Sequence, residues 1–177
     1  MTIRYVAFLR GINVGGHKII KMEALRRTFE SWGLSNVSTF IQSGNVIFDS
    51  NKVGAQALES KVASQLAVSL GYPVGIFLRT TRALAAIAAH PPFDMAETDI
   101  LYIAFLHARP TRAAQSALLA LQNDVDELAV KGREAYWLRH RDLGESRLAS
   151  NFLEKALGMP ATARNMTSIR KIVEKYA

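Results

Sequence analysis

The spacing of apolar residues divides the first half of the chain into alternating strands and helices. Residues 3–9 are apolar at nearly every position, as in a buried strand, while Met22, Leu25 and Phe29 recur at helical spacing before Gly33. The predicted elements are a strand over 3–9, a helix over 21–32, a hairpin over 37–42 and 46–49, a helix over 55–70 and a strand over 74–79. This order, βαββαβ, is that of a ferredoxin-like unit.

The second half of the chain repeats this pattern after a proline-rich break. A short helix predicted over 82–89 ends before Pro91-Pro92, where we expect a domain boundary. The run Tyr102–Leu106 repeats Tyr5–Leu9 almost unchanged at an offset of 97 residues. The predicted elements that follow are a strand over 100–106, a helix over 112–122, a hairpin over 127–131 and 135–139, and helices over 147–157 and 167–176.

These elements predict an α+β fold made of duplicated ferredoxin-like βαββα units. We expect a first domain over residues 1–90, which carries a glycine-rich loop, and a second over residues 91–177, which ends in helices. Both copies of the repeated strand are apolar on both faces, so we expect the central strands to be buried on both faces. That arrangement disfavours an open sheet that reads RNA with exposed aromatic side chains.

Composition narrows the chemistry that the chain can perform. The 177 residues include no cysteine, which excludes disulfides, thiolate metal sites and thiol nucleophiles. Lys and Arg number 22 against 15 Asp and Glu, a net charge of +7. The excess lies in residues 1–27, with six basic residues and one acidic, and in residues 133–177, with nine and five. If the two ends meet in the fold, they form a basic surface that attracts phosphates or nucleic acid; otherwise the charges only solvate helix faces.

Hydropathy gives an expectation about location. The apolar run Tyr5–Leu9 is too short for the core of a signal peptide, and no stretch approaches the roughly 18 apolar residues of a membrane helix. We therefore expect a cytoplasmic protein without membrane association.

The segment between the first predicted strand and helix, residues 10–18, is the strongest candidate for a binding site. Its counterpart in the second half, residues 107–111, is several residues shorter, and function is commonly added in longer loops. Its glycines allow backbone N–H groups to approach a ligand, and its cations can grip an anion. The predicted ligand contacts here are Arg10, Asn13, Gly15, Gly16 and Lys18. The segment is not a P-loop, because His17 replaces the motif's lysine, and a glycine turn without a ligand is the alternative.

Two further segments contribute predicted contacts. Gln42, Ser43 and Asn45 belong to the predicted hairpin turn, which could adjoin the glycine-rich loop, although Ser and Asn also suit a turn by themselves. Arg164 and Asn165 precede the last helix, where an arginine beside free backbone N–H groups can bind an anion and Asn165 is a plausible N-cap.

Signals for catalysis are weak. The four histidines, His17, His90, His107 and His140, show neither metal-ligand spacing nor a carboxylate at a ligand offset, so no metal site is predicted, and the sequence leaves the question of a cofactor open. Ser146 is interpreted as the N-cap of the helix over 147–157. Near the glycine-rich loop, His17 is the candidate proton carrier and Glu23 the nearby acid.

Several of these segments together resemble the domain of unknown function 1697 family. The similar segments are Arg10-Gly-Ile-Asn-Val-Gly-Gly16, Lys21-Met22 with Leu25-Arg26, Ile41-Gln-Ser-Gly-Asn-Val46, Gly144-Glu-Ser-Arg-Leu148 and Thr162-Ala-Arg-Asn165. The resemblance covers nearly the whole chain and implies a two-part, bacterial-type α+β protein built on ferredoxin-like units, without an established activity. Met166 stands where that family has tryptophan, and Arg147 where it has lysine.

Three functional hypotheses follow from these observations. The first is binding of a phosphate-bearing ligand, either a nucleotide or nucleic acid, at the basic glycine-rich loop. The second is an enzyme that acts on a small anionic substrate, in which Arg10, Lys18 and Arg164 stabilise developing charge. The third is a non-catalytic scaffold or homo-oligomer whose edge strands pair between chains. The sequence favours the first and leaves the ligand and the oligomeric state open.

Overall fold

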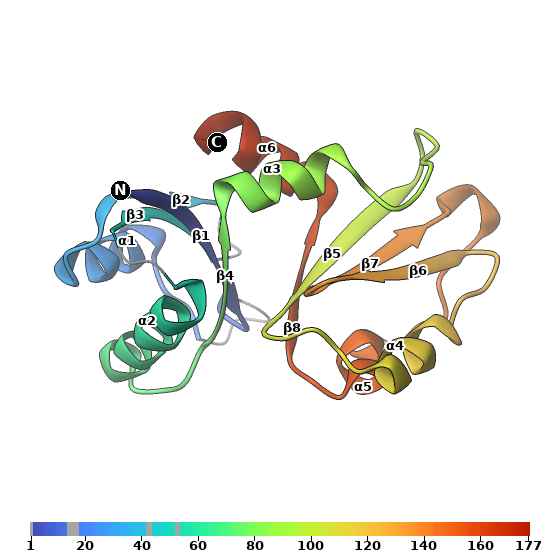
Figure 1. Cartoon of the computed structure of the whole chain (residues 1–177), viewed down its shortest axis with the longest axis horizontal. Coiled ribbons are helices and arrows are strands. Elements are labelled where there is room, and N and C mark those ends of the chain that lie inside the picture. Colours follow the sequence, from blue (N-terminus) through green and yellow to red (C-terminus); the bar gives the residue numbers. More distant parts are fainter. Residues whose placement is uncertain (1, 14–17, 42–43, 52–53) are drawn as a thin grey trace. The chain divides into compact units, whose positions relative to one another are not determined.

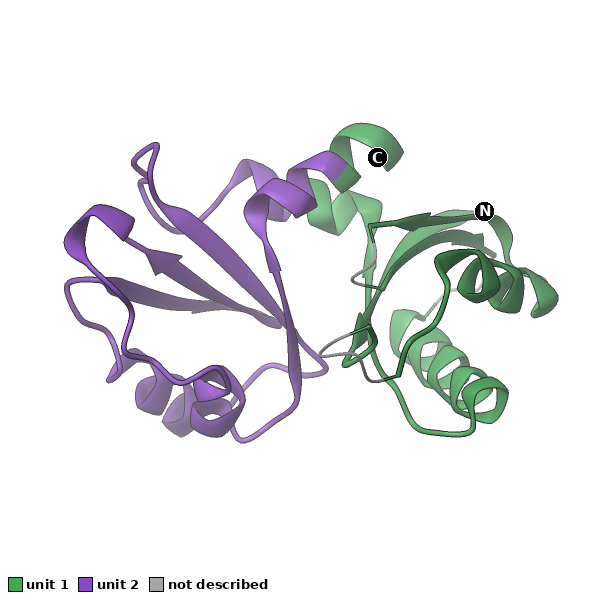
Figure 2. Cartoon of the chain, turned by 180° about the vertical axis from the view of Figure 1, so that it is seen from behind, with its two compact units in different colours: residues 1–86, 172–177 green, residues 87–171 purple. Residues whose placement is uncertain are grey.

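The fold is described here from a computed structural model that covers residues 2–13, 18–41, 44–51 and 54–177 (Figure 1). The chain forms two compact units (Figure 2). Unit 1 comprises residues 1–86 together with 172–177, and unit 2 comprises residues 87–171. The last six residues of the chain therefore belong to the same unit as its beginning.

Unit 1 has the predicted βαββαβ order. Its elements are β1 (Ile3–Arg10), α1 (Met22–Ser31), β2 (Ser35–Phe40), β3 (Asn45–Ser50), α2 (Ala55–Leu70) and β4 (Gly75–Thr80), followed by α3 (Thr81–Ala89), which continues into unit 2. The strands form an antiparallel sheet in the order β2-β3-β1-β4. This is the ferredoxin-like topology, so the predicted fold of the first half is confirmed.

Unit 2 has the same topology, with one strand that the sequence analysis did not predict. Its elements are β5 (Ile100–Leu106), α4 (Arg112–Leu119), β6 (Asp126–Lys131), β7 (Glu134–Arg139), a short 3-10 turn η1 (Arg141–Leu143), α5 (Phe152–Leu157) and β8 (Ala161–Asn165), and α6 (Met166–Tyr176) continues into unit 1. The sheet order β6-β7-β5-β8 corresponds to that of unit 1, strand by strand. Strand β8 pairs with β5 and completes the second βαββαβ unit.

Each sheet buries one face under its own pair of helices. In unit 1, Leu25 and Phe29 of α1 and Leu58, Val62 and Leu66 of α2 pack on this face of the sheet. In unit 2 the corresponding helices α4 and α5 cover the sheet, with contacts from Leu118, Phe152, Leu153 and Leu157. The hydrophobic stripes of these helices thus point inward, as their sequence spacing requires.

The opposite face of each sheet is also apolar and buried. In unit 1 it carries Val6, Phe8, Ile47 and Phe77, and in unit 2 Leu101, Ile103, Phe105, Tyr136 and Leu138. The prediction that the central strands are buried on both faces is therefore confirmed. In unit 1 the end of the chain lies on this side: the Tyr176 ring contacts Phe40 edge-on at 6.4 Å, and the Arg4 guanidinium lies 5.5 Å from the centre of the Tyr176 ring.

The edge strands of unit 1 carry features that oppose pairing with another chain. The backbone N–H of Leu78 in edge strand β4 donates to the buried carboxylate of Glu59 at 2.6 Å. On the other edge, the pairing of β2 with β3 is interrupted near Asn36, which has a φ of 50°. A satisfied outward N–H and an irregular edge both make the addition of a further strand unfavourable.

The segment before α5 differs from the prediction. A helix was predicted over 147–157 with Ser146 as its N-cap, but α5 begins only at Phe152. The Ser146 hydroxyl instead donates to the fully buried carboxylate of Asp126 at 2.9 Å and accepts from the backbone N–H of Leu148 at 3.3 Å. Because Ser146 is anchored to β6, the residues that follow it take an irregular path before the helix begins.

Candidate functional site

The glycine-rich loop and the hairpin turn, which are the two predicted contact segments of unit 1, adjoin the same end of its sheet. Strand β1 ends at Arg10, which pairs with Gly75 at the start of β4. Strand β3 begins at Asn45, which pairs with Phe8 of β1 and with Phe40 at the end of β2. The glycine-rich loop and the hairpin turn therefore leave the sheet side by side, a possibility that the sequence analysis raised. The Asn45 side chain, predicted as a ligand contact, is instead fully buried and donates from Nδ2 to the Phe40 carbonyl at 2.9 Å.

The hairpin turn packs tightly against the glycine-rich loop through Gly44. A Cβ atom added at Gly44 would lie 2.6 Å from Ile12 Cδ1 and 3.1 Å from Leu9 Cβ, and Gly44 has a φ of 76°. The Gly44 carbonyl also accepts a hydrogen bond of 2.8 Å from the backbone N–H of Leu9. Only glycine meets both requirements, so this residue joins the two segments.

Asn13 closes the base of the loop. Its side-chain Oδ1 accepts from the backbone N–H of Ile20 at 2.8 Å, and its Nδ2 donates to the Ile20 carbonyl at 3.1 Å. The backbone N–H of Asn13 also donates to the carbonyl of Lys18 at 3.3 Å. The Asn13 side chain, predicted as a ligand contact, thus holds the two ends of the loop together.

Two cationic side chains lie at this end of the sheet, where β1 ends and β4 begins. Arg10 is exposed, and its side chain runs over Gly75, where a Cβ atom would lie 3.3 Å from Arg10 Cβ. Lys18 is also exposed, and its ammonium group lies 5.0 Å from the centre of the Tyr72 ring, just before β4. The Lys18 charge is therefore held near Tyr72, and the Arg10 side chain packs over Gly75 at the start of β4.

Three non-glycine residues with positive φ angles lie at the same end of the sheet. The non-glycine residues Asn13, Lys18 and Ile41 have φ values of 54°, 50° and 52°. For a β-branched residue such as Ile41 this conformation is strained, by about 1–3 kcal/mol. Backbone strain of this kind concentrates where a fold presents a binding site, because the rest of the structure must offset its cost.

Part of the predicted site lies outside the described residues. The predicted contacts that lie outside are Gly15, Gly16, Gln42 and Ser43, and the candidate proton carrier, His17, lies outside as well. The nearby acid, Glu23, is described: its carboxylate accepts from Arg26 at 2.6 Å and from Arg27 at 3.0 Å, and these hydrogen bonds lower its pKa to about 2. Glu23 is therefore ionised and paired on α1 at neutral pH.

Arg164 and Asn165 differ in how they match the prediction. Asn165 caps α6, since its Oδ1 accepts from the backbone N–H of Ser168 at 2.8 Å. Arg164 was expected at the N-terminus of the last helix, beside its free N–H groups, but it lies within β8 and is buried. Its guanidinium donates to the Thr162 hydroxyl at 2.9 Å and to the Ala163 carbonyl at 2.8 Å, and burial lowers its pKa to about 10.

The position of Arg164 is repeated in unit 1. In unit 2, Arg164 of β8 pairs with Ile103 of β5. The equivalent of Ile103 in unit 1 is Val6 of β1, and Val6 pairs with Arg79 of β4. Arg79 is likewise buried, and its guanidinium donates to the preceding carbonyl, of Leu78, at 2.8 Å. The duplication therefore preserves one buried arginine at the same place in each sheet. A comparison of the two halves that aligned β4 with β8 would have revealed it.

His140 forms a contact that sequence spacing did not reveal. Its Nδ1 lies 3.0 Å from Asp99 Oδ1, and its Nε2 lies 2.6 Å from Glu127 Oε1. The two carboxylates lie on opposite sides of the imidazole ring and share no point at which a metal could bind. Within the described part of the chain, no cluster of His, Asp and Glu side chains is arranged to hold a metal ion.

The stability of unit 2 should depend on the ionisation of His140. Hydrogen bonds with Glu127 and then Asp99 raise its pKa above the ordinary value, so its contribution is complete below about pH 6.5 and is lost as pH rises through the raised pKa. We expect His140→Gln to lower the free energy of unfolding more at pH 5.5 than at pH 9, as measured by urea denaturation. A Glu127→Gln variant should show a smaller pH dependence than wild type. An equal loss at both pH values would contradict this reading.

Comparisons with known proteins place the chain in a family. No curated protein sequence matches it. A solved structure of conserved bacterial protein SP0830 from Streptococcus pneumoniae is similar, with a TM-score of 0.71 and 24% identity over 98% of each chain, which supports the fold alone. Among the described helices, none has the length and apolar character needed to cross a bilayer. Residues 1–136 match the family described as "Protein of unknown function (DUF1697)". That match spans most of the chain, both described segments of the glycine-rich loop included, and the protein therefore belongs to the DUF1697 family.

Proposed function

We propose that this protein binds a phosphate-bearing ligand, a nucleotide or nucleic acid, at the end of the unit 1 sheet where the glycine-rich loop and the hairpin turn meet. The observation that carries the proposal is the placement of two exposed cations, Arg10 and Lys18, beside a loop held in strained conformations. A guanidinium can bind two phosphate oxygens at once, and an ammonium adds a point charge.

The surroundings of these cations favour an anion. Glu23, the first acidic residue after the loop, is paired with Arg26 and Arg27, so α1 presents a neutralised carboxylate. Gly11 has a positive φ and no side chain, so the backbone of the loop can approach a ligand closely beside Arg10. Arg164 and Asn165 belong to the other part of the sequence, and their participation in this site stays a prediction.

Pairing of edge strands between chains is less well supported. The outward-facing backbone N–H of Leu78 on β4 already donates to the Glu59 carboxylate, and the pairing of β2 is irregular near Asn36. Both edges of this sheet are thereby protected.

The test is a titration of ATP and of a short single-stranded oligonucleotide by isothermal calorimetry at two salt concentrations. We expect the affinity to fall as salt rises, and Arg10→Ala and Lys18→Ala each to weaken binding by about tenfold, the loss of one charge-assisted contact. Arg82→Ala, which removes an exposed arginine from α3, is the charge-matched control and should bind like wild type. Binding that is absent for both ligands, or equally weakened by all three variants, would overturn the proposal.

A further inference from the structure

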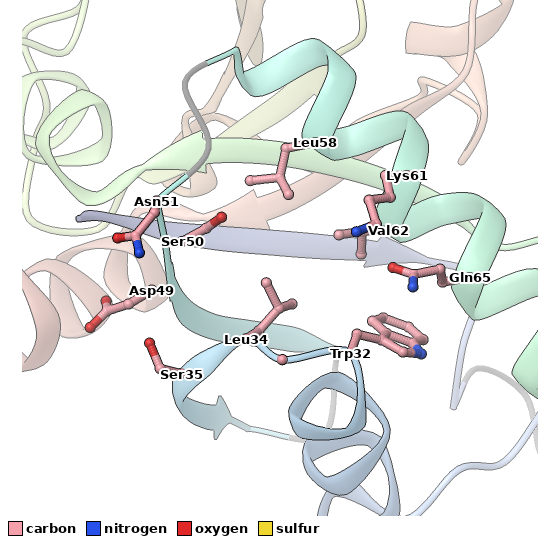
Figure 3. A pocket seen from close by; sticks show the side chains of 11 residues that line it. Trp32, Leu34, Ser35, Asp49, Ser50, Asn51, Leu58, Lys61, Val62 and Gln65 are labelled. Carbon is pink, nitrogen blue, oxygen red and sulfur yellow. The ribbon is translucent and has the colours of Figure 1, made fainter. Parts of the chain in front are cut away.

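Unit 1 contains a cavity at the end of its sheet opposite to Arg10. It has a volume of about 200 Å³ and opens between α2, the end of β3 and the connection from α1 to β2 (Figure 3). In Figure 3 the side chains of α2 lie above the cavity and those of Trp32, Leu34 and Ser35 below it. The register of β1 with β3 separates this cavity from the loop by the length of the sheet, because Ile3 pairs with Ser50 and Phe8 with Asn45.

The inner wall of the cavity is apolar. Leu58 and Val62 of α2 are buried in the core, with exposed fractions of 3% and 1%, and they face the cavity from one side. Trp32 and Leu34 are half-buried and face it from the other. Phe29 supports the indole from behind, with ring centres 4.9 Å apart. The indole is therefore held by the core and offers a fixed aromatic surface to an occupant.

The rim of the cavity carries neutral hydrogen-bonding groups. Ser35, Ser50, Asn51 and Gln65 line it. The Gln65 carboxamide offers both a donor and an acceptor, whereas Asn51 Oδ1 already accepts from the Thr2 hydroxyl at 2.8 Å. In Figure 3 the Gln65 carboxamide and the Trp32 indole lie on the same side of the cavity. An apolar wall with a few polar groups at its edge is the usual construction of a small-molecule site.

The carboxylate at the rim does not select a cation. Asp49 Oδ1 accepts from Arg4 at 2.9 Å, and Asp49 Oδ2 accepts from Asn36 at 2.7 Å. Both oxygens are thus engaged by groups outside the cavity lining, and the charge is balanced by Arg4. Lys61 also lines the cavity from α2 and is exposed to solvent, so water hydrates its charge. Neither charged residue therefore prevents an uncharged molecule from occupying the cavity.

The corresponding place in unit 2 shows that this lining is not a consequence of the fold. A cavity of about 400 Å³ opens there between the connection from α4 to β6 and the connection from β7 to α5. Its lining includes the charged residues Asp124, Glu145 and Arg147 and no aromatic ring. The duplicated topology thus places a cavity in each unit, and only the lining in unit 1 combines an aromatic wall with carboxamides.

We infer that the cavity of unit 1 binds a small uncharged planar ring with an amide-type edge, the chemistry of a nucleobase or a carboxamide-substituted heterocycle. The ring stacks on Trp32 between the side chains of Leu34 and Leu58, and its edge exchanges hydrogen bonds with Gln65, which lies on the same side of the cavity as the indole. A cavity of roughly 150 Å³ is large enough for benzene, so this one accepts a substituted six-membered ring. The inference is independent of phosphate binding, since its ligand carries no charge.

The test uses the two tryptophans of the chain as reporter and control. Adenine and nicotinamide are titrated into the full-length protein while the indole N–H signals of Trp32 and Trp137 are followed by NMR. We expect the Trp32 signal to shift saturably with a dissociation constant on the order of millimolar, as for a fragment of this size. The Trp137 signal should stay in place, because that N–H donates to buried Asp126 at 2.7 Å.

Variants separate specific binding from a general solvent effect. Gln65→Ala should weaken binding about fivefold through the loss of a hydrogen bond, whereas Gln56→Ala, at an exposed position of the same helix, should bind like wild type. Ser35→Phe, at an exposed strand position on the rim, should abolish the shift. The inference is overturned by a Trp32 signal that neither compound moves, by equal shifts of both indole signals, or by a shift that persists in Ser35→Phe.

Discussion

Replacing Asp126 with alanine should lower the free energy of unfolding of unit 2 by about 3–5 kcal/mol, the usual cost of removing one partner from a buried polar network. The carboxylate is fully buried and accepts three side-chain hydrogen bonds. Trp137 Nε1 donates to it at 2.7 Å, Ser146 Oγ at 2.9 Å and Asn123 Nδ2 at 3.2 Å. All three donors lose their acceptor in the variant.

The measurement is urea unfolding followed by the fluorescence of Trp137 in a Trp32→Phe background, which reports on unit 2 alone. Ser146→Ala removes a single donor and serves as the matched control, with an expected loss of about 1 kcal/mol. If the two variants cost the same, the carboxylate does not organise the network and the interpretation of the Gly144-Glu-Ser146 segment as an anchor on β6 is wrong.

Replacing Gly44 with alanine should destabilise unit 1 by about 2–4 kcal/mol. Two costs combine: a φ of 76° that an L side chain rarely adopts, and a Cβ placed 2.6 Å from Ile12 Cδ1. Ile12 is only 1% exposed, so it cannot move aside without disturbing the core. The variant should also reduce phosphate binding, because Gly44 fixes the loop against the hairpin.

Gly33→Ala is the control for Gly44→Ala. Gly33 has a φ of 75°, but no atom lies within 4 Å of the Cβ that alanine would add. Its expected cost is the conformational part alone, about 1 kcal/mol. Thermal or urea unfolding followed by Trp32 fluorescence in a Trp137→Phe background compares the two. Equal losses would show that the contact with Ile12 contributes nothing.

The elements that the sequence predicted well are those whose signals are local. The leucines and valines four residues apart define α2 to the residue, and the two apolar runs define β1 and β5. The duplication was visible because the repeated strand is central in both sheets and therefore keeps its apolar character. The turn preference of Ser43 and Asn45 likewise located the first hairpin.

The elements that the sequence missed depend on contacts between distant residues. Strand β8 consists mainly of small and polar residues with little strand preference, and it exists because it pairs with β5. The start of α5 is set by the hydrogen bond from Ser146 to Asp126, twenty residues away. For the same reason Arg164 was placed before a helix instead of inside a sheet.

The candidate sites show the same division. Composition and turn preference predicted Arg10, Asn13, Lys18 and Asn45 as site residues. In the structure these four residues lie at one end of the sheet of unit 1. The cavity of unit 1 has no sequence signal, because its lining comes from three separate segments whose residues are individually ordinary. The contacts of His140 were hidden in the same way, since Asp99 lies 41 residues before it.

The most direct test of phosphate binding at the glycine-rich loop is an NMR titration with ATP that follows backbone amide signals. Binding of ATP at the loop should give saturable shifts for Gly11, Asn13, Lys18 and Gly44, with no shift for Ser35 at the far end of the sheet. These shifts should disappear in the Arg10→Ala/Lys18→Ala double variant. Saturable shifts confined to residues away from the loop, or loop shifts that survive in the double variant, would contradict phosphate binding at the loop.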